Sequence, residues 1–142
     1  MDTSAVFWRT YFLALLAEVY GKGGKVEEGL AVLVEALRRA ADTRVGFYEP
    51  EMHRVQGELL LARAPANPAD AEACFRQAIA IARRQGAKSL ELRAVLSLSR
   101  LFLRQGKEEE ARPMLAEIYG WFTEGFDTAD LHEAKALLEV IS

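Results

Sequence analysis

The residue types that most often perform catalysis or bind metals are rare in this sequence. It contains two histidines, His53 and His132, and a single cysteine, Cys74. Neither histidine has the spacing from cysteines or carboxylates that a metal site requires, and neither lies at a recognisable motif distance from Cys74. Ala73 and Phe75 flank the cysteine and indicate packing in the core. We therefore expect no enzyme activity, no metal and no cofactor, and a structural or surface role for both histidines.

The glycine-rich segment 21–25, GKGGK, comes nearest to a phosphate-binding loop. A P-loop follows a strand and has Ser or Thr directly after its lysine. Here Val26 follows Lys25. The glycines therefore indicate a turn between two helices.

Charged residues gather near the ends of the predicted helices. Glutamates occupy positions 27–28 and 108–110, in first turns, and arginine pairs occupy positions 38–39 and 83–84, in last turns. Each sign suits the dipole at its end of a helix, so these clusters indicate solvated helix ends rather than paired catalytic acids or a DNA-reading stripe. The net charge of -3 also disfavours nucleic acid and anionic lipid as partners.

The rest of the chain is organised as helices. Apolar residues recur at helical spacing, and alternation with a period of two over a β-branched run is hard to find. Glycines and prolines cut the 142 residues into pieces that are each long enough for one helix. We predict an all-α fold of seven helices at 4–21, 25–42, 49–64, 68–85, 88–105, 107–121 and 128–141.

Several helix starts are predicted from capping chemistry. Asn67 is expected to cap the fourth helix with Pro68 in its first turn, and Pro50 suits the first turn of the third helix. The last helix is expected to be capped by Asp127, Thr128 and Asp130. Pro113 lies about two turns into the sixth helix, so a local kink or a late helix start is expected there.

Small residues repeat along the chain at a nearly constant interval. They recur at positions 17, 57 and 99, and again at 29, 71 and 111, a period of 40 to 42 residues. The segment GKVEEGLAVL at 24–33 also aligns with GKEEEARPML at 106–115, and AEACFRQA at 71–78 supplies a similar copy between them. Small residues let paired helices approach closely, while large residues fill the space between them.

These repeats resemble the tetratricopeptide repeat (TPR), in which a Leu-Gly-Tyr helix precedes an Ala-Phe-Ala helix. The matching residues are Leu13, Leu16, Ala17, Tyr20, Gly29, Leu33 and Ala36, then Gly57, Leu60, Ala71, Phe75 and Ala78, then Val95, Leu98, Ser99, Phe102, Ala111, Leu115 and Ile118. Two departures are the period, which is longer than the usual value of about 34, and the polar His53 and Gln56 at usually apolar positions.

The long period is similar to that of the helical repeats at the C-terminal end of large bacterial signalling proteins with a nucleotide-cyclase or ATPase portion. The segments that carry this resemblance are YFLALLAEVYGKGGKVEEGL, EACFRQAIAIARRQGAKSLELRA and YGWFTEGFDTADLHEAKALLE. It implies an α-solenoid of three hairpins, 4–42, 47–86 and 88–121, with a capping helix at 128–141, as one domain of a larger protein. It also implies a non-catalytic interaction or regulatory scaffold, and the alternative function is a small-molecule effector sensor.

In TPR proteins the first helix of each hairpin lines a concave groove that binds a protein or peptide partner. Carried over to this chain, the groove positions are Tyr11, Ala14, Glu18 and Lys22, then Glu51, Arg54 and Glu58, then Arg93, Ser97, Arg100 and Arg104. The groove is expected to become basic toward its third repeat. Its arginines could fork onto a peptide carboxylate or phosphate, or Glu18, Glu58, Arg54 and Arg100 could pair with one another. The clamp of chaperone-binding relatives is not reproduced.

The first predicted helix lacks a polar face. Within residues 5–20 only Arg9, Thr10 and Glu18 are not apolar, and these interrupt the run before it reaches the roughly 18 to 20 apolar residues of a membrane span. A helix that is apolar all round needs cover all round. We infer either a missing upstream repeat or a homodimer surface formed by Phe7, Trp8, Phe12 and Leu15. With no export signal and one cysteine, a cytoplasmic location without a membrane partner is expected.

Overall fold

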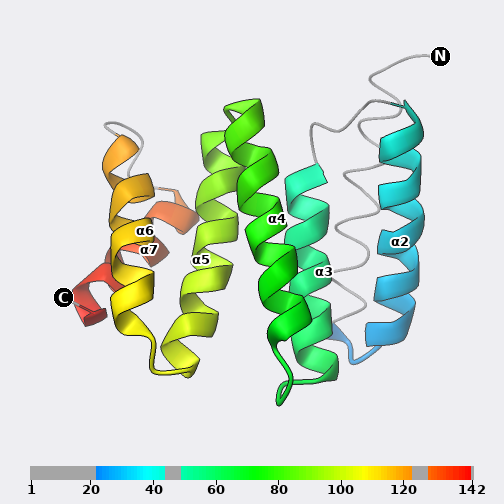
Figure 1. Cartoon of the computed structure of the whole chain (residues 1–142), viewed down its shortest axis with the longest axis horizontal. Helices are drawn as coiled ribbons and strands as arrows, with labels where there is room; N and C mark the ends of the chain where they lie inside the picture. Colours follow the sequence, from blue (N-terminus) through cyan, green and yellow to red (C-terminus); the bar gives the residue numbers. More distant parts are fainter. Residues whose placement is uncertain (1–21, 44–48, 123–127, 142) are drawn as a thin grey trace.

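A computed structural model of the chain describes residues 22–43, 49–122 and 128–141, and these form an all-α structure (Figure 1). The helices in the described part are α2 (Val26–Thr43), α3 (Glu49–Arg63), α4 (Ala69–Gln85), α5 (Lys88–Arg104), α6 (Glu108–Trp121) and α7 (Ala129–Ile141). Each agrees with a predicted helix to within about a residue at either end. The seventh prediction, the helix at 4–21, lies outside the described residues, so six helices are described rather than seven.

The helices pack in the order in which they follow along the chain. Each described helix contacts the next one, and Figure 1 shows α2 to α6 succeeding one another along the longest axis of the molecule. Two further contacts skip one helix, namely α3 with α5 and α5 with α7. Among the described helices, α2 does not contact α4, and α4 does not contact α6. The odd-numbered helices therefore lie closer to one another than the even-numbered helices do.

Small residues allow the closest of these approaches. Gly57 of α3 is buried against α4, where an added Cβ would lie 2.5 Å from Cε1 of Phe75 and 3.1 Å from the carbonyl oxygen of Ala71. The predicted contact of small against large residues is thus confirmed at this pair of helices. The other repeated small residues in the described part, which are Gly29, Ala71, Ser99 and Ala111, are also buried. Ala17 lies outside the described residues.

Buried apolar side chains form two clusters that follow this order of packing. The larger cluster runs from α3 to α7 and includes Phe75 and Leu115, both fully buried. The smaller cluster joins α2 to α3 through Leu33 and Met52. Burial recurs at helical spacing, as in α4, where Ala71, Phe75, Ala78 and Ala82 form one buried stripe. The helices are therefore held mainly by apolar contact between neighbours.

The turns use glycine as the sequence predicts. Gly24, Gly86 and Gly106 have φ values of 81°, 68° and 74°, which L side chains rarely adopt. At the end of α4, the N–H of Gly86 donates to the carbonyl of Arg83 at 3.1 Å and closes the helix. Gly23 and Gly24 form a turn before α2, so the prediction of a turn is confirmed there.

One predicted cap is wrong and one is confirmed. α4 begins at Ala69 with Pro68 as its N-cap, and no side chain caps it. Asn67 lies one residue too early, where its N–H donates to the carbonyl of Ala64 within the preceding turn. Thr128 does cap α7, because its hydroxyl accepts a hydrogen bond from the N–H of Leu131 at 3.3 Å.

The two helical prolines behave differently from each other. Pro50 lies in the first turn of α3, as predicted, where its missing N–H costs nothing. Pro113 lies inside α6, which begins at Glu108, so the predicted late start is wrong. Ala111, Leu115 and Ile118 are buried along one face of that helix. Their packing maintains helical structure across the proline, because burial outweighs the loss of one backbone hydrogen bond.

Candidate functional site

Three helices place charged side chains on one face of the molecule. We name this set the groove cluster, and its members are Glu51, Arg54 and Glu58 of α3, Arg93, Ser97 and Arg100 of α5, and Asp130 and Glu133 of α7. Within each helix the members are three, four or seven residues apart, which puts them on one side of that helix. Because α5 contacts both α3 and α7, its stripe meets the other two.

Arg93 links all three helices. Its Nη1 donates to Glu51 Oε1 of α3 at 3.2 Å, and its Nε donates to Asp130 Oδ2 of α7 at 3.2 Å. Partial burial lowers the pKa of the Arg93 guanidinium, but the carboxylates of Glu51 and Asp130 outweigh it and raise that pKa above its usual value. Arg93 therefore stays charged and ties α3 to α7.

Arg100 makes a second link of the same kind, two helical turns further along α5. Its Nη1 donates to Glu133 of α7, and its Nη2 lies 3.5 Å from Glu58 Oε1 of α3. The same Nη2 donates to the hydroxyl of Ser97 at 3.3 Å. The cluster thus contains two parallel links, each running from a carboxylate through an arginine to a carboxylate.

Arg54 lies between the two links and is buried. Its Nη2 and Nε both donate to Glu51, at 2.6 Å and 3.0 Å, in a two-pronged ion pair. Its Nη1 donates to the Ser97 hydroxyl at 3.4 Å and lies 3.9 Å from Glu58 Oε1. Glu51 is therefore a buried carboxylate that holds both Arg54 and Arg93.

The charges of the groove cluster nearly balance. Its three arginines and four carboxylates give a net charge of -1. The expectation that the face becomes basic toward the third repeat is wrong for this cluster, because Asp130 and Glu133 of α7 offset Arg93 and Arg100. The alternative in which Arg54, Glu58 and Arg100 pair with one another is confirmed. The fourth member of that alternative, Glu18, lies outside the described residues.

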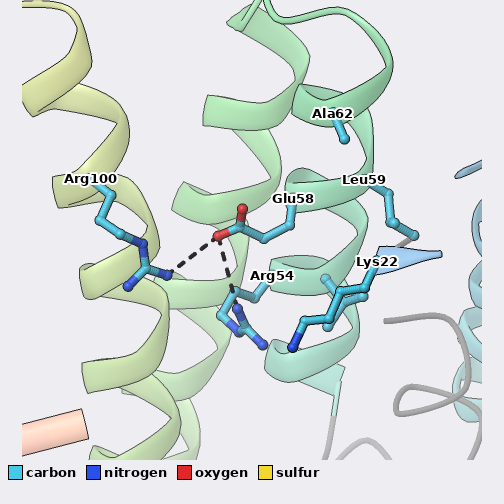
Figure 2. Close-up of a pocket in the computed structure, with 7 residues that line it drawn as sticks. Lys22, Arg54, Glu58, Leu59, Ala62 and Arg100 are labelled. Carbon is cyan, nitrogen blue, oxygen red and sulfur yellow. Dashed lines mark hydrogen bonds and ion pairs between the residues drawn. The ribbon is translucent and has the colours of Figure 1, made fainter. Parts of the chain in front are cut away.

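Two hollows open on this face and share two arginines. The first, which we name the α3 pocket, has a volume of about 390 Å³ and is shown in Figure 2. Its described lining comprises Lys22, Arg54, Val55, Glu58, Leu59, Ala62 and Arg100. The second, the α7 pocket, has a volume of about 280 Å³ and is lined by Arg54, Arg93, Leu96, Arg100, Asp130 and Glu133. The guanidinium groups of Arg54 and Arg100 lie where the two hollows meet.

The predicted groove residues divide into three groups. Glu51, Arg54, Glu58, Arg93, Ser97 and Arg100 come together in the cluster, and Lys22 lines the α3 pocket beside it. Arg104 is exposed near the end of α5 and is not a member of it. The groove residues Tyr11, Ala14 and Glu18 and the self-association residues Phe7, Trp8, Phe12 and Leu15 lie outside the described residues.

Sequence reasoning missed the contribution of α7. The sequence predicts only a capping role for Asp130 and no partner for Glu133, whereas both bind arginines of α5. Their spacing of three residues on one helix was a signal that both face the same way. The spacing alone does not say which helix they face, because that depends on how α7 packs on α5.

In the part of the chain that the structure describes, the histidines and the cysteine do not form a second site. His53 is buried, and burial lowers the pKa of its imidazole, while a hydrogen bond from its Nε2 to the Glu49 carboxylate partly offsets that effect. Burial and Asp70 raise the pKa of the Cys74 thiol, so little thiolate is present at neutral pH. Cys74 is half-buried rather than a full core residue. Across residues 22–43, 49–122 and 128–141, no group of three or more metal-ligating side chains occurs.

Comparison with known proteins gives one weak likeness. The sequence matches no protein-family model. It is 34% identical over 90 residues to an uncharacterized protein of Rhizobium meliloti (strain 1021), and the match covers 63% of this chain and 9% of that relative. The chain therefore spans a small part of the relative's length. None of the described helices is long and apolar enough to cross a membrane.

Proposed function

We propose that this chain is a non-catalytic protein–protein interaction module that binds a segment of a partner protein along the face of α3, α5 and α7. The groove cluster is the observation that carries the proposal. Three successive odd-numbered helices direct charged side chains to one face, and two open hollows lie among them. Such a surface offers many directional contacts and no catalytic group.

The proposal includes a TPR-like solenoid of three hairpins and a capping helix. The pattern of contacts supports it, since α3 meets α5 and α5 meets α7 while the described even-numbered helices stay apart. A row of helix pairs curves when the helices on one side lie closer together than the helices on the other side. The side with the closer helices becomes the concave side. The odd-numbered helices would then form the concave surface, where the groove cluster lies.

The lining of the hollows favours a peptide over a small apolar effector. The α3 pocket has a volume within the range of small-molecule sites, which is about 300–1,000 Å³. However, four of its seven described lining residues are charged, whereas small-molecule sites are mostly apolar. A small-molecule sensor therefore remains the second candidate function, and an extended polar partner is the first.

We extend the proposal to the setting of the module, as one part of a larger bacterial signalling protein in the cytoplasm. The matched relative supports the part of this extension that concerns a larger bacterial protein, because it is a Rhizobium protein and the match covers only 9% of its length. A homodimer through Phe7, Trp8, Phe12 and Leu15 stays a prediction. Light scattering tests it, and a monodisperse monomer would contradict it.

Peptide selection tests the proposed function. Random 12-residue peptides would be selected against the full chain, and their affinities measured by fluorescence anisotropy. We expect Arg93→Ala to weaken binding at least tenfold, because central arginines dominate such interfaces. The matched control is Arg76→Ala on α4, whose partner is Glu72 on the same helix, and it should change the affinity less than twofold. Selected peptides that bind both variants as tightly as the unchanged chain would contradict the proposal.

A further inference from the structure

We propose that Glu58 is an internal competitor in the α3 pocket, where its carboxylate occupies a site that Arg54 and Arg100 form for an oxyanion. The partner segment would then present a carboxylate or phosphate group that displaces Glu58. This inference rests on the proposed function and names the chemistry that the groove recognises. It also predicts an unusual result, namely that removing a charged groove residue strengthens binding.

The two guanidinium groups converge on the same pair of acceptors. Arg54 Nη1 and Arg100 Nη2 both donate to the Ser97 hydroxyl, at 3.4 Å and 3.3 Å. The same two nitrogens lie 3.9 Å and 3.5 Å from Glu58 Oε1, and Figure 2 shows Glu58 between the two arginines. Two cations from different helices thus meet at one point, and an anion there relieves their mutual repulsion.

Each arginine binds a fixed carboxylate in addition to this shared point. Arg54 uses Nη2 and Nε for Glu51, and Arg100 uses Nη1 for Glu133. A different terminal nitrogen of each, Nη1 of Arg54 and Nη2 of Arg100, contacts Ser97 and Glu58. The fixed carboxylates would therefore keep both guanidinium groups in position while Glu58 is exchanged for a ligand.

Glu58 is held more loosely than Glu51. Its side chain is 34% exposed and its ion pairs are 3.5 Å and 3.9 Å long, whereas the side chain of Glu51 is 4% exposed and lies 2.6 Å from Arg54. Ion pairs of that length are weak when one partner is partly exposed, because water competes for the Glu58 carboxylate. A ligand oxyanion with better geometry can therefore take the place of Glu58, whereas the burial and short contacts of Glu51 oppose its exchange.

The α3 pocket and the α7 pocket differ in the residues that surround the two arginines. Val55, Leu59 and Ala62 form an aliphatic wall of the α3 pocket, and Lys22 adds a further cation to its lining. The α7 pocket instead contains the two carboxylates of Asp130 and Glu133. We therefore assign the oxyanion to the α3 pocket, next to an aliphatic part of the same ligand.

Titration of the full chain with simple anions tests the proposal. The probes are inorganic phosphate and acetate at constant ionic strength, and the readout is the NMR shift of the arginine Nε–H signals. We expect Glu58→Gln to bind phosphate about fivefold more tightly than the unchanged chain, because an internal anion of modest strength has been removed. Adding Arg100→Gln to that variant should abolish the gain.

Glu72→Gln is the matched control, because Glu72 is also partly exposed and pairs with an arginine, Arg76, but lies on α4. It should leave the affinity for phosphate unchanged.

The two probes distinguish the chemical group of the ligand. If Glu58→Gln binds only phosphate more tightly, the pocket recognises a phosphate group; if it also binds acetate more tightly, the pocket recognises carboxylates as well. No gain for either probe in Glu58→Gln and in a second variant, Glu58→Ala, would overturn the proposal. A gain in phosphate affinity that persists in the double variant with Arg100→Gln would also overturn the proposal. Peptide selection could still succeed in those cases, so the two proposals fail separately.

Discussion

Replacing Gly57 by alanine tests how tightly α3 and α4 pack. The new Cβ would lie 2.5 Å and 2.8 Å from two ring carbons of Phe75, and 3.1 Å from the carbonyl oxygen of Ala71. Phe75 is fully buried, so its ring cannot move without displacing other core residues. Either the ring leaves its position or the two helices separate.

Two opposing terms set the expected magnitude. Alanine favours a helix interior over glycine by about 1 kcal/mol, whereas inserting a methyl group into a packed core costs about 1–3 kcal/mol, and more when backbone is involved. Since Gly57 meets both a buried ring and a backbone oxygen, we expect the upper part of that range. The net loss in the free energy of unfolding is then about 2 kcal/mol.

Urea denaturation followed by circular dichroism at 222 nm measures this loss. The control is Gly120→Ala, because Gly120 is also helical, in α6, but a Cβ there would meet no atom within 4 Å. That variant should be as stable as the unchanged chain or slightly more stable. Combining Gly57→Ala with Phe75→Leu should cost less than the sum of the two changes, because the smaller side chain makes room for the methyl group. A Gly57→Ala variant of unchanged stability, or strict additivity with Phe75→Leu, would refute the packing argument.

Three further predictions concern individual polar residues. Glu51→Gln should lower the free energy of unfolding by about 3 kcal/mol, because it removes the buried carboxylate that pairs with Arg54 and Arg93. Glu72→Gln should change that free energy by less than about 0.5 kcal/mol. Urea denaturation compares the two variants, and equal losses would contradict the prediction. Burial lowers the pKa of His53 below its unfolded value of 6.5, so the unfolded chain binds more protons and stability should fall as pH drops below about 6.5; His53→Gln should flatten that dependence between pH 7.5 and 5, and an unchanged slope would contradict it. The raised pKa of Cys74 should make its reaction with a disulfide reagent slower in the folded chain than in denaturant at pH 8, and equal rates would contradict it.

The positions of the helices could be predicted from sequence because their signals are local. Glycines at Gly24, Gly86 and Gly106 end one segment and begin the next, and all three adopt positive φ values in the structure. Helical spacing alone also places Arg93, Ser97 and Arg100 on one face of α5. These features depend on neighbouring residues within one helix or turn, so one sequence suffices to find them.

The charge balance of the groove cluster depends on contacts between helices and could not be predicted in the same way. Asp130 and Glu133 belong to α7, and they offset the arginines of α5 only because α7 packs beside it. The burial of Arg54 and Glu51 likewise arises from the stacking of three helices. Asn67 shows a local error of another kind, because Pro68 takes the N-cap position and leaves the asparagine outside the helix.

Amide hydrogen exchange of the full chain, with and without a peptide selected against it, tests the central claim most directly. If a partner segment lies along the proposed face, the peptide should slow exchange in α3, α5 and α7 and leave α2, α4 and α6 nearly unchanged. Protection confined to the even-numbered helices, or spread evenly over all of them, would contradict the account.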